Sequence, residues 1–274
     1  MQHLNIRTPP DHICRYVSDI TCSFPRSGAF SADQRIIYSG VLEAQRAVFD
    51  MMRPGVSWPA CHKAAEAKII EALTLAGVLV GGSSAELSQV PGLGAVFFPH
   101  GLGHLIGCDT HDVGGYIEGT PSRHAGAGVQ KLRTARVLEE GMVLTNEPGC
   151  YFVDILLDAA LADASLSQYI DAAALQRFRG FGGMRLEDVV LVTRDGCDNL
   201  TQCPRTVEEV EGVVGGAMQW PPEVDSAPWL RRRWSRLAPG GEGMQEIAVP
   251  AIAVAIAIPC TETLSEKEIT PTFF

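Results

Sequence analysis

The sequence predicts an α+β protein. Two segments near its start repeat apolar residues at helical spacing, and several short apolar or β-branched runs bounded by Gly, Pro and Asp are typical of strands. The chain has 274 residues, of which 46% are hydrophobic and 20% are charged. This apolar fraction can close a sizeable core, so a mostly disordered or fibrous protein is excluded.

The two predicted helices near the start are amphipathic. The first covers residues 31–53, where Ser31 and Gln34 form a capping box and a Pro-Gly pair follows the last turn. The second covers about residues 59–76 and ends at Gly77. We expect both helices to lie on a sheet.

The predicted sheet is built from short strands spread over the chain. The strands are residues 13–21, 141–145, 150–153 and 188–193. Two further helices are predicted at residues 165–178 and Val207–Val214.

Composition excludes several classes of protein. The net charge is -10 and the pI is about 5.2, whereas nucleic-acid binding requires a basic surface. The eight cysteines include no Cys-x-x-Cys pair, which argues against a zinc knuckle or a disulfide scaffold. No signal peptide is expected, and the longest apolar run, residues 247–258, is too short to span a bilayer. We predict a soluble protein of a reducing compartment, the cytoplasm by default, with neither nucleic acid nor membrane as a partner.

The composition changes after about Ala217. Tryptophans, a Pro-Pro pair, three consecutive arginines at 231–233 and a Gly-rich patch follow without a clear hydrophobic period. We therefore predict one folded domain over residues 1–216 and an irregular, poorly ordered tail over residues 217–274. A nuclear-import or partner-binding role for the arginines is the alternative.

Three histidines are concentrated in one glycine-rich segment. The stretch FFPHGLGHLIGCDTHDVGG contains His100, His104 and His111. A lone histidine is usually structural, but three among glycines, which allow close backbone approach to a ligand, favour a metal or catalytic site. The glycines and the missing glutamate exclude the helical pair of a zincin, so a strand or loop is expected to carry these histidines.

Three carboxylates occur in comparable positions at strands. Glu147 follows the apolar run MVLT, Glu187 precedes DVVLV, and Asp19 belongs to SDITCSFP. A glutamate at a strand end is costly to bury unless a cation or a donor compensates its charge. Taken singly, each of them could equally well face solvent.

Five ordered motifs carry a family resemblance. They are PHGLGHLIG with HDVGG, LRTAR, GMVLTNEPGCYF, LQRFRGFGGMRLEDVVLVT and CPRTVEEVEG. Together they resemble the catalytic domain of prolidases, which are pita-bread metallopeptidases. The resemblance implies the pita-bread (creatinase/aminopeptidase-like) fold, incomplete at its N-terminal side, because about 200 of the 274 residues match only the C-terminal portion of that domain.

The resemblance also implies a reaction and a set of metal ligands. The family hydrolyses Xaa-Pro dipeptides through a metal-activated hydroxide, using two divalent cations, typically manganese. By motif, the ligands present here are Asp19, His104, Glu147 and Glu187. One imidazole among oxygen donors suits manganese, cobalt or iron better than a thiolate zinc site.

Roles outside the ligand set follow from the same resemblance. Glu147 is implied as the group that moves the proton, and His111 as the imidazole that stabilises the oxyanion. Arg133 is implied to pair with the free carboxylate of the substrate, for which a planar guanidinium is well suited. His100 and Arg185 are implied to lie behind the ligands, close to the substrate. A homodimer is expected, as in the family.

The sequence departs from the family at one ligand. The first metal-binding aspartate of the family lies eleven positions before the one matched by Asp19, and that position here is Thr8. The earlier strands and helices of the family's domain are also not matched. We therefore expect one well-bound cation and impaired activity. The alternative is an inactive prolidase fragment that acts as a binding or dimerisation partner. An aminopeptidase P-like enzyme is disfavoured by the segment between the two glutamates.

Overall fold

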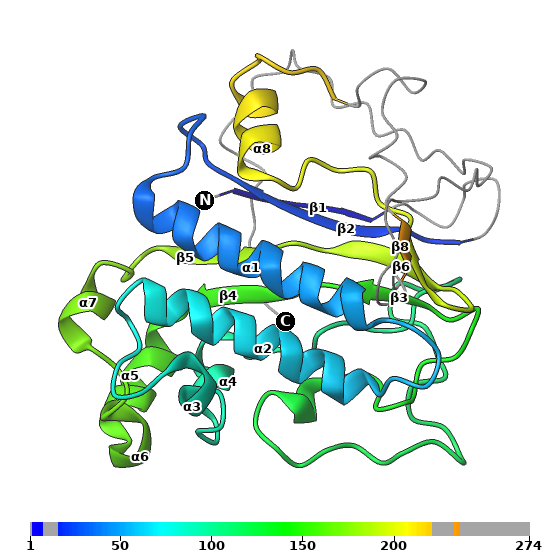
Figure 1. The fold of residues 1–274 in the computed structure, drawn as a ribbon, viewed down its shortest axis with the longest axis horizontal. Helices are drawn as coiled ribbons and strands as arrows, with labels where there is room; N and C mark the ends of the chain where they lie inside the picture. Colours follow the sequence, from blue (N-terminus) through cyan, green and yellow to red (C-terminus); the bar gives the residue numbers. More distant parts are fainter. Residues whose placement is uncertain (1, 8–15, 221–232, 236–274) are drawn as a thin grey trace, which may run out of the picture. The chain divides into compact units, whose positions relative to one another are not determined.

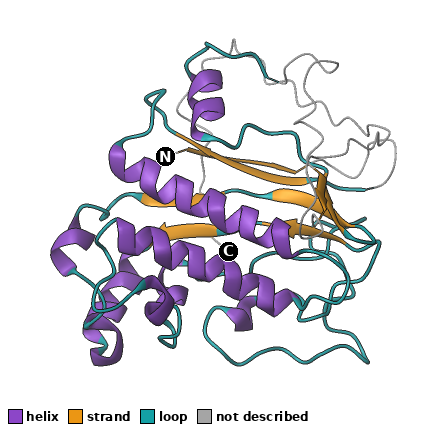
Figure 2. Cartoon of the chain, viewed as in Figure 1, coloured by secondary structure: helices purple, strands orange, loops and turns teal. Residues whose placement is uncertain are grey.

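The computed structural model describes residues 2–7, 16–220 and 233–235 (Figure 1). The chain divides into two compact units, Met1–Gly243 and Met244–Phe274, and all described residues belong to the first. Helices and strands are both present in that unit (Figure 2). The predicted α+β class is therefore correct.

Both long predicted helices form. They are α1 (Ala32–Met51) and α2 (Trp58–Leu75). The side chain of Ser31 caps α1 in the predicted capping box with Gln34, and Ser57 caps α2. These side-chain oxygens accept backbone N–H groups that the first helical turn leaves unpaired.

The two helices pack closely against each other, and α1 also contacts the strands behind it (Figure 1). A Cβ atom added at Gly40 of α1 would lie 2.2 Å from the Cβ of Ala72 of α2. The missing side chain lets the two helix backbones approach at this point. A larger residue at position 40 would push the helices apart.

The described strands form three small antiparallel sheets. β1 (Gln2–Arg7) pairs with β2 (Asp19–Phe24), and β4 (Gly149–Phe152) pairs with β5 (Gly182–Arg185). The third sheet has the order β3-β6-β7-β8. Its strands are β3 (Val143–Asn146), β6 (Asp188–Val192), β7 (Gly196–Asn199) and β8 (Arg233–Ser235).

Two isolated β-bridges connect these sheets to the segments that contain the predicted site residues. Thr21 of β2 bridges to Glu187, which lies between β5 and β6. Leu105 bridges to Leu144 of β3, so the histidine-bearing segment runs antiparallel beside that strand. Residues far apart in the sequence are thereby brought to one place.

The other predicted strands and both long helices form within one or two residues of their expected bounds, and two predicted elements differ more from the structure. The strand predicted at residues 13–21 begins at Asp19 and continues to Phe24; residues 13–15 lie outside the described residues. The helix predicted at residues 165–178 is interrupted, because the segment before Asp171 pairs with another part of the chain. The amide of Val80 donates to the carbonyl of Tyr169 (2.9 Å), and the amide of Asp171 donates to that of Val78 (3.0 Å).

The remaining helices are short. The predicted helix at Val207–Val214 forms as α8. The interrupted helix is represented by α6 (Ala164–Ser167) and α7 (Ala172–Gln176). Four further elements were not predicted from the sequence: α3 (Ser84–Leu87), α4 (Leu93–Phe97), the 3-10 turn Val129–Lys131 and α5 (Asp154–Ala162).

The predicted tail lies largely outside the described residues. Residues 221–232 and 236–274 are not described, and β8 falls within the range expected to be irregular. The boundary near residue 217 therefore stays a prediction. Within the described part of the chain, no helix has the length and apolar character needed to cross a bilayer.

The buried guanidinium of Arg205 connects β2 to the start of β6. Arg205 and Asp188 are each 1% exposed and form an ion pair. Arg205 also donates to the carbonyl of Thr21 (3.0 Å) and to that of Glu187 (2.7 Å). Asp188 accepts a further hydrogen bond from Asn199 (2.7 Å). The positively charged side chain of Arg205 therefore holds these two segments together.

We predict that replacing Arg205 with Met destabilises the fold by about 3–5 kcal/mol, because Asp188 is left as a buried, unpaired charge. The free energy of unfolding in urea measures this cost. Arg46→Met is the control, since Arg46 pairs with Glu43 on the exposed face of α1 and its loss should cost about 1 kcal/mol or less. Equal costs for the two variants would contradict the structural role of Arg205.

Candidate metal centre

Four of the predicted site residues meet at one place. The imidazole Nε2 of His104 lies 3.7 Å from Oδ2 of Asp19 and 3.5 Å from Oε1 of Glu147. One ligand atom each of His104, Glu147 and Glu187 lies within 4.8 Å of the others. All four residues are at least 93% buried, with exposures of 1% for Asp19, 2% for His104, 7% for Glu147 and 1% for Glu187.

Pairing with β3 positions His104. The amide of Thr145 donates to the carbonyl of His104 (2.9 Å), and the amide of Glu147 donates to that of Leu102 (2.9 Å). A Cβ at Gly103 would lie 1.9 Å from the carbonyl oxygen of Thr145, so only glycine permits this approach. The Gly-rich segment thereby places His104 beside Glu147.

Two threonine hydroxyls orient the glutamates. Thr21 donates to Oε2 of Glu187 over 2.5 Å, and Thr145 donates to Oε1 of Glu147 over 3.2 Å. Thr145 also accepts from the amide of His104 (3.1 Å). Both carboxylates are therefore fixed by neighbours on β2 and β3.

Burial makes the negative charges of the cluster costly. It raises the pKa of the Glu147 carboxyl, and the nearby Arg185 guanidinium opposes this shift. It also raises the pKa of Glu187 well above its usual range, with Glu147 and Asp19 adding to the shift. Positive charge placed among these groups would stabilise their ionised forms.

The tautomer of His104 leaves a lone pair facing the carboxylates. Its Nδ1 lies 3.0 Å from the carbonyl oxygen of Leu105, which can only accept, so Nδ1 carries the proton. In the neutral ring, Nε2 then faces Asp19 and Glu147 as a further acceptor. Such a convergence of acceptors is favourable only around a cation, either a proton on Nε2 or a metal ion. The donor set, one imidazole and three carboxylates, fits a hard divalent cation.

A chain of three side chains supports Glu147 from behind. Arg185 pairs with Oε2 of Glu147 over 3.1 Å and donates from Nε to the Tyr151 hydroxyl over 2.8 Å. That hydroxyl lies 2.9 Å from Nε2 of His100, whose Nδ1 faces the Gly101 carbonyl at 2.8 Å. Burial lowers the pKa of His100 well below its usual range, so the ring is neutral and Tyr151 donates to it.

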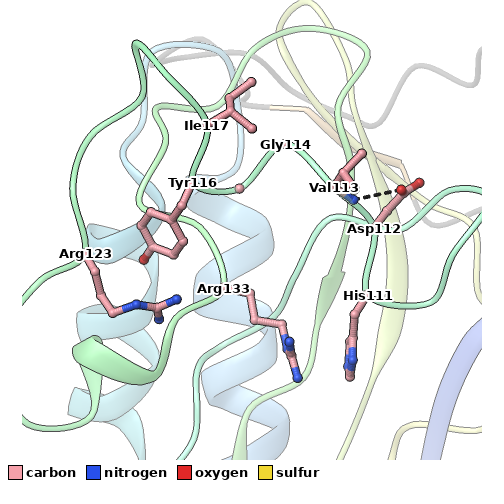
Figure 3. Close-up of a pocket in the computed structure, with 9 residues that line it drawn as sticks. His111, Asp112, Val113, Gly114, Tyr116, Ile117, Arg123 and Arg133 are labelled. Carbon is pink, nitrogen blue, oxygen red and sulfur yellow. Dashed lines mark hydrogen bonds between the residues drawn. The ribbon is translucent and has the colours of Figure 1, made fainter.

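A pocket adjoins the cluster on its exposed side. The ring of His111 lies 4.4 Å from that of His104, nearly perpendicular to it, and a ligand atom of His111 lies within 4.8 Å of ligand atoms of Asp19 and His104. His111 and Arg133 line a pocket of about 320 Å³ and extend in the same direction (Figure 3). Arg123, also in the pocket, stacks over the ring of Tyr116 at 4.3 Å.

The structure thus brings the predicted ligands, His111, His100 and Arg185 into one continuous region and places Arg133 in the pocket beside His111. Thr8 lies outside the described residues. Tyr151 and the two threonines were not predicted from the sequence. Neither the spacing nor the residue type of Tyr151 points to a site; its role depends on the pairing of β4 with β5, which brings it opposite Gly183 and near Arg185.

Known proteins resemble this chain over the region that carries the cluster. Residues 12–194 match metallopeptidase family M24. The human protein named Xaa-Pro dipeptidase is 52% identical over 201 residues, which is 73% of this chain and 40% of the human protein. A protein of Uncinocarpus reesii named "Probable Xaa-Pro aminopeptidase PEPP" is 43% identical over 202 residues, again 40% of its length. The chain therefore spans about 40% of the length of these relatives.

Solved structures agree with the sequence matches. The structure of Pseudomonas aeruginosa aminopeptidase PepP is 37% identical, with a TM-score of 0.58, over 75% of this chain and 40% of that protein. Zn-substituted Escherichia coli aminopeptidase P in complex with product is 32% identical, with a TM-score of 0.53, over 75% of this chain and 39% of that protein. The predicted pita-bread fold is thereby confirmed, and the chain belongs to metallopeptidase family M24.

Proposed function

We propose that this chain carries the catalytic centre of a hydrolase acting on Xaa-Pro dipeptides. The buried cluster of Asp19, His104, Glu147 and Glu187 is the observation that carries the proposal. Family membership makes the chain part of a metallopeptidase, and the likeness to proteins named Xaa-Pro dipeptidase supports the choice of substrate.

The four residues would hold a divalent cation, and we propose manganese because hard oxygen donors predominate. When bound, the cation supplies positive charge that acidifies a water molecule and polarises the scissile carbonyl. The residues of this chain would orient the donor atoms before the cation binds. Thr21 and Thr145 hold the two glutamates, and Leu105 sets the tautomer of His104.

The pocket would receive the peptide. A dipeptide with proline at its C-terminal end has no N–H at the scissile bond, so recognition must rely on its ends and its carbonyl. The Arg133 guanidinium would pair with the free carboxylate, and His111 would donate to the oxygen of the scissile carbonyl as negative charge develops there. Both side chains extend toward the same space (Figure 3).

Glu147 would move the proton. It lies beside His104 and is held at its second oxygen by Arg185. From this position it would accept a proton from the attacking water and deliver it to the proline nitrogen as the bond breaks. Tyr151 and His100 would keep Arg185 aligned with Glu147 and exclude water behind it.

Three finer proposals go beyond the cluster itself. By motif, Thr8 corresponds to a ligand carboxylate of the family, so we propose that one of two cations binds weakly and that turnover is low. A homodimer is proposed on the same basis, whereas a cytoplasmic location is proposed from the scattered cysteines and the sequence pattern. An inactive chain that serves as a binding or dimerisation partner is the second candidate, and Thr8 is the observation that favours it.

The first prediction concerns metal binding. In EDTA, Glu187→Gln should melt at a higher temperature than the unmodified chain, because a neutral amide replaces a buried carboxylate repelled by its neighbours. Added Mn²⁺ should stabilise the unmodified chain, by about 2.7 kcal/mol at 100 times the Kd, and should barely change the variant. Thermal melts with EDTA or Mn²⁺ measure both effects.

Glu139→Gln is the matched control for this experiment. Its side chain is 65% exposed and pairs with Arg136 away from the cluster, so the variant should keep the full Mn²⁺ response. A full Mn²⁺ response in Glu187→Gln would remove Glu187 from the ligand set.

The second prediction concerns the substrate carboxylate. With Mn²⁺ present, Arg133→Ala should weaken binding of Gly-Pro by about 10- to 100-fold, in line with about 1.5–3 kcal/mol for a hydrogen bond to a charged group. Binding of the Gly-Pro amide should change little. Calorimetric titration gives both constants, and hydrolysis of Gly-Pro gives the effect on KM. Lys131→Ala, on the neighbouring exposed turn, is the control. An equal loss for dipeptide and amide would leave Arg133 with a packing role only.

The third prediction concerns the number of cations. The unmodified chain should bind about one Mn²⁺, and Thr8→Asp should raise the bound number toward two by restoring a carboxylate ligand. In Thr8→Asn, the new side chain has the shape of aspartate without its charge, so the number of bound Mn²⁺ ions should stay near one. Elemental analysis of the dialysed protein gives the ratio. Two tightly bound Mn²⁺ ions in the unmodified chain, with rapid Gly-Pro hydrolysis, would contradict this proposal.

A further inference from the structure

Two side chains of the pocket wall hold the backbone that carries Arg133. Arg133 follows the 3-10 turn Val129–Lys131 after one intervening residue, Leu132. The carbonyl of Leu132 accepts two hydrogen bonds, one from the Tyr116 hydroxyl (3.0 Å) and one from Nη1 of Arg123. This carbonyl belongs to the planar peptide unit whose N–H is that of Arg133. The orientation of that peptide unit therefore depends on Tyr116 and Arg123.

The side chain of Arg123 is itself fixed, although it is exposed. Its guanidinium stacks over the ring of Tyr116, with Cζ 4.3 Å from the ring centroid, and its Nη1 also donates to the carbonyl of Gln130 (3.0 Å). A planar guanidinium can stack on a ring and still donate hydrogen bonds in its own plane. One side chain therefore connects an aromatic ring to two backbone carbonyls.

Two glycines bring other parts of the backbone against the same segment. A Cβ at Gly115 would lie 2.1 Å from the carbonyl oxygen of Arg133, and a Cβ at Gly101 would lie 2.8 Å from Cα of Leu132. No larger residue fits at either position unless the backbone moves. Leu132 is fully buried between these contacts. The backbone at Leu132 and Arg133 is thus held from several directions.

The side chain of Arg133 has no such support. It is exposed, and within the part of the chain that the structure describes it forms no hydrogen bond or ion pair. Figure 3 shows it extending beside His111, with Arg123 on the side of Arg133 away from His111. Because no neighbouring side chain orients the Arg133 guanidinium, its position in the pocket depends on the backbone that carries it.

We propose that Tyr116 and Arg123 are positioning residues that hold Arg133 in place for the free carboxylate of the substrate. This inference rests on the proposed function, in which Arg133 pairs with that carboxylate. Tyr116 and Arg123 act through Arg133 and do not contact the substrate themselves. A guanidinium that is already in place loses less conformational entropy on binding than one that must first be ordered. The two residues therefore strengthen the preference for a dipeptide over its amide.

The first test measures binding by calorimetric titration with Mn²⁺ present. Arg123→Met, which keeps an unbranched side chain, should weaken binding of Gly-Pro about 10-fold, as for a lost hydrogen bond of ordinary strength. Tyr116→Phe keeps the ring and loses only the hydroxyl, so its effect should be smaller, about 3-fold. Binding of the Gly-Pro amide should change little in both variants, because it lacks the carboxylate. Lys131→Met removes an equal positive charge two residues before Arg133 and should leave both affinities unchanged.

A double variant distinguishes positioning from direct contact. When Arg133 is already replaced by Ala, adding Arg123→Met should cost little further affinity for Gly-Pro, because Arg123 acts only through Arg133. A further 10-fold loss would show that Arg123 acts on the substrate itself and would overturn the proposal. Equal losses for Gly-Pro and its amide in Arg123→Met would also overturn it, because they would leave Tyr116 and Arg123 with a structural role only.

Crystal structures keep this inference separate from the proposed function. In Arg123→Met and in Tyr116→Phe, the Leu132 carbonyl should rotate and the Arg133 guanidinium should shift or lose defined density, compared with the unmodified chain in the same crystal form. An Arg133 side chain that keeps its place in both variants would overturn the positioning role, whatever the chain binds. Equal binding of Gly-Pro and its amide by the unmodified chain would instead contradict the proposed role of Arg133.

Discussion

Three carboxylates are buried beside one imidazole at the point where β2, β3 and the start of β6 meet. Asp19, Glu147 and Glu187 are almost entirely removed from water, although burial raises the pKa of both glutamates and so opposes their ionised forms. Such an arrangement costs stability unless positive charge is supplied among the groups. Binding of a cation would recover that cost, which is why we propose that these four residues form a metal site.

Two arginines, Arg185 and Arg205, hold the cluster in place through different contacts. Arg185 pairs with Glu147 and is itself oriented by Tyr151, so it acts within the site. Arg205 pairs with Asp188 and binds the carbonyls of Thr21 and Glu187, so it acts on the backbone that carries the ligands. Arg185 therefore orients the side chain of Glu147, whereas Arg205 holds β2 and the start of β6 together. Both depend on contacts between segments far apart in the sequence.

The sequence predicted what local pattern and motif can encode. Helical spacing and a capping box located α1, and the motifs around His104, Glu147 and Glu187 named residues that the structure brings together. Tertiary contacts decided the rest. The helix expected at residues 165–178 is interrupted because Asp171 and Tyr169 pair with residues near Val78, and no local preference reveals such a partner. The role of Tyr151 was missed for the same reason, since strand pairing creates it.

We propose that Asp19, His104, Glu147 and Glu187 together bind a divalent cation. Anomalous diffraction from crystals grown with Mn²⁺ tests it most directly. The predicted result is an anomalous peak within about 2.0–2.3 Å of Nε2 of His104 and of carboxylate oxygens of the cluster. A peak bound only by other residues, or crystals in excess Mn²⁺ with no peak between these four side chains, would contradict the account.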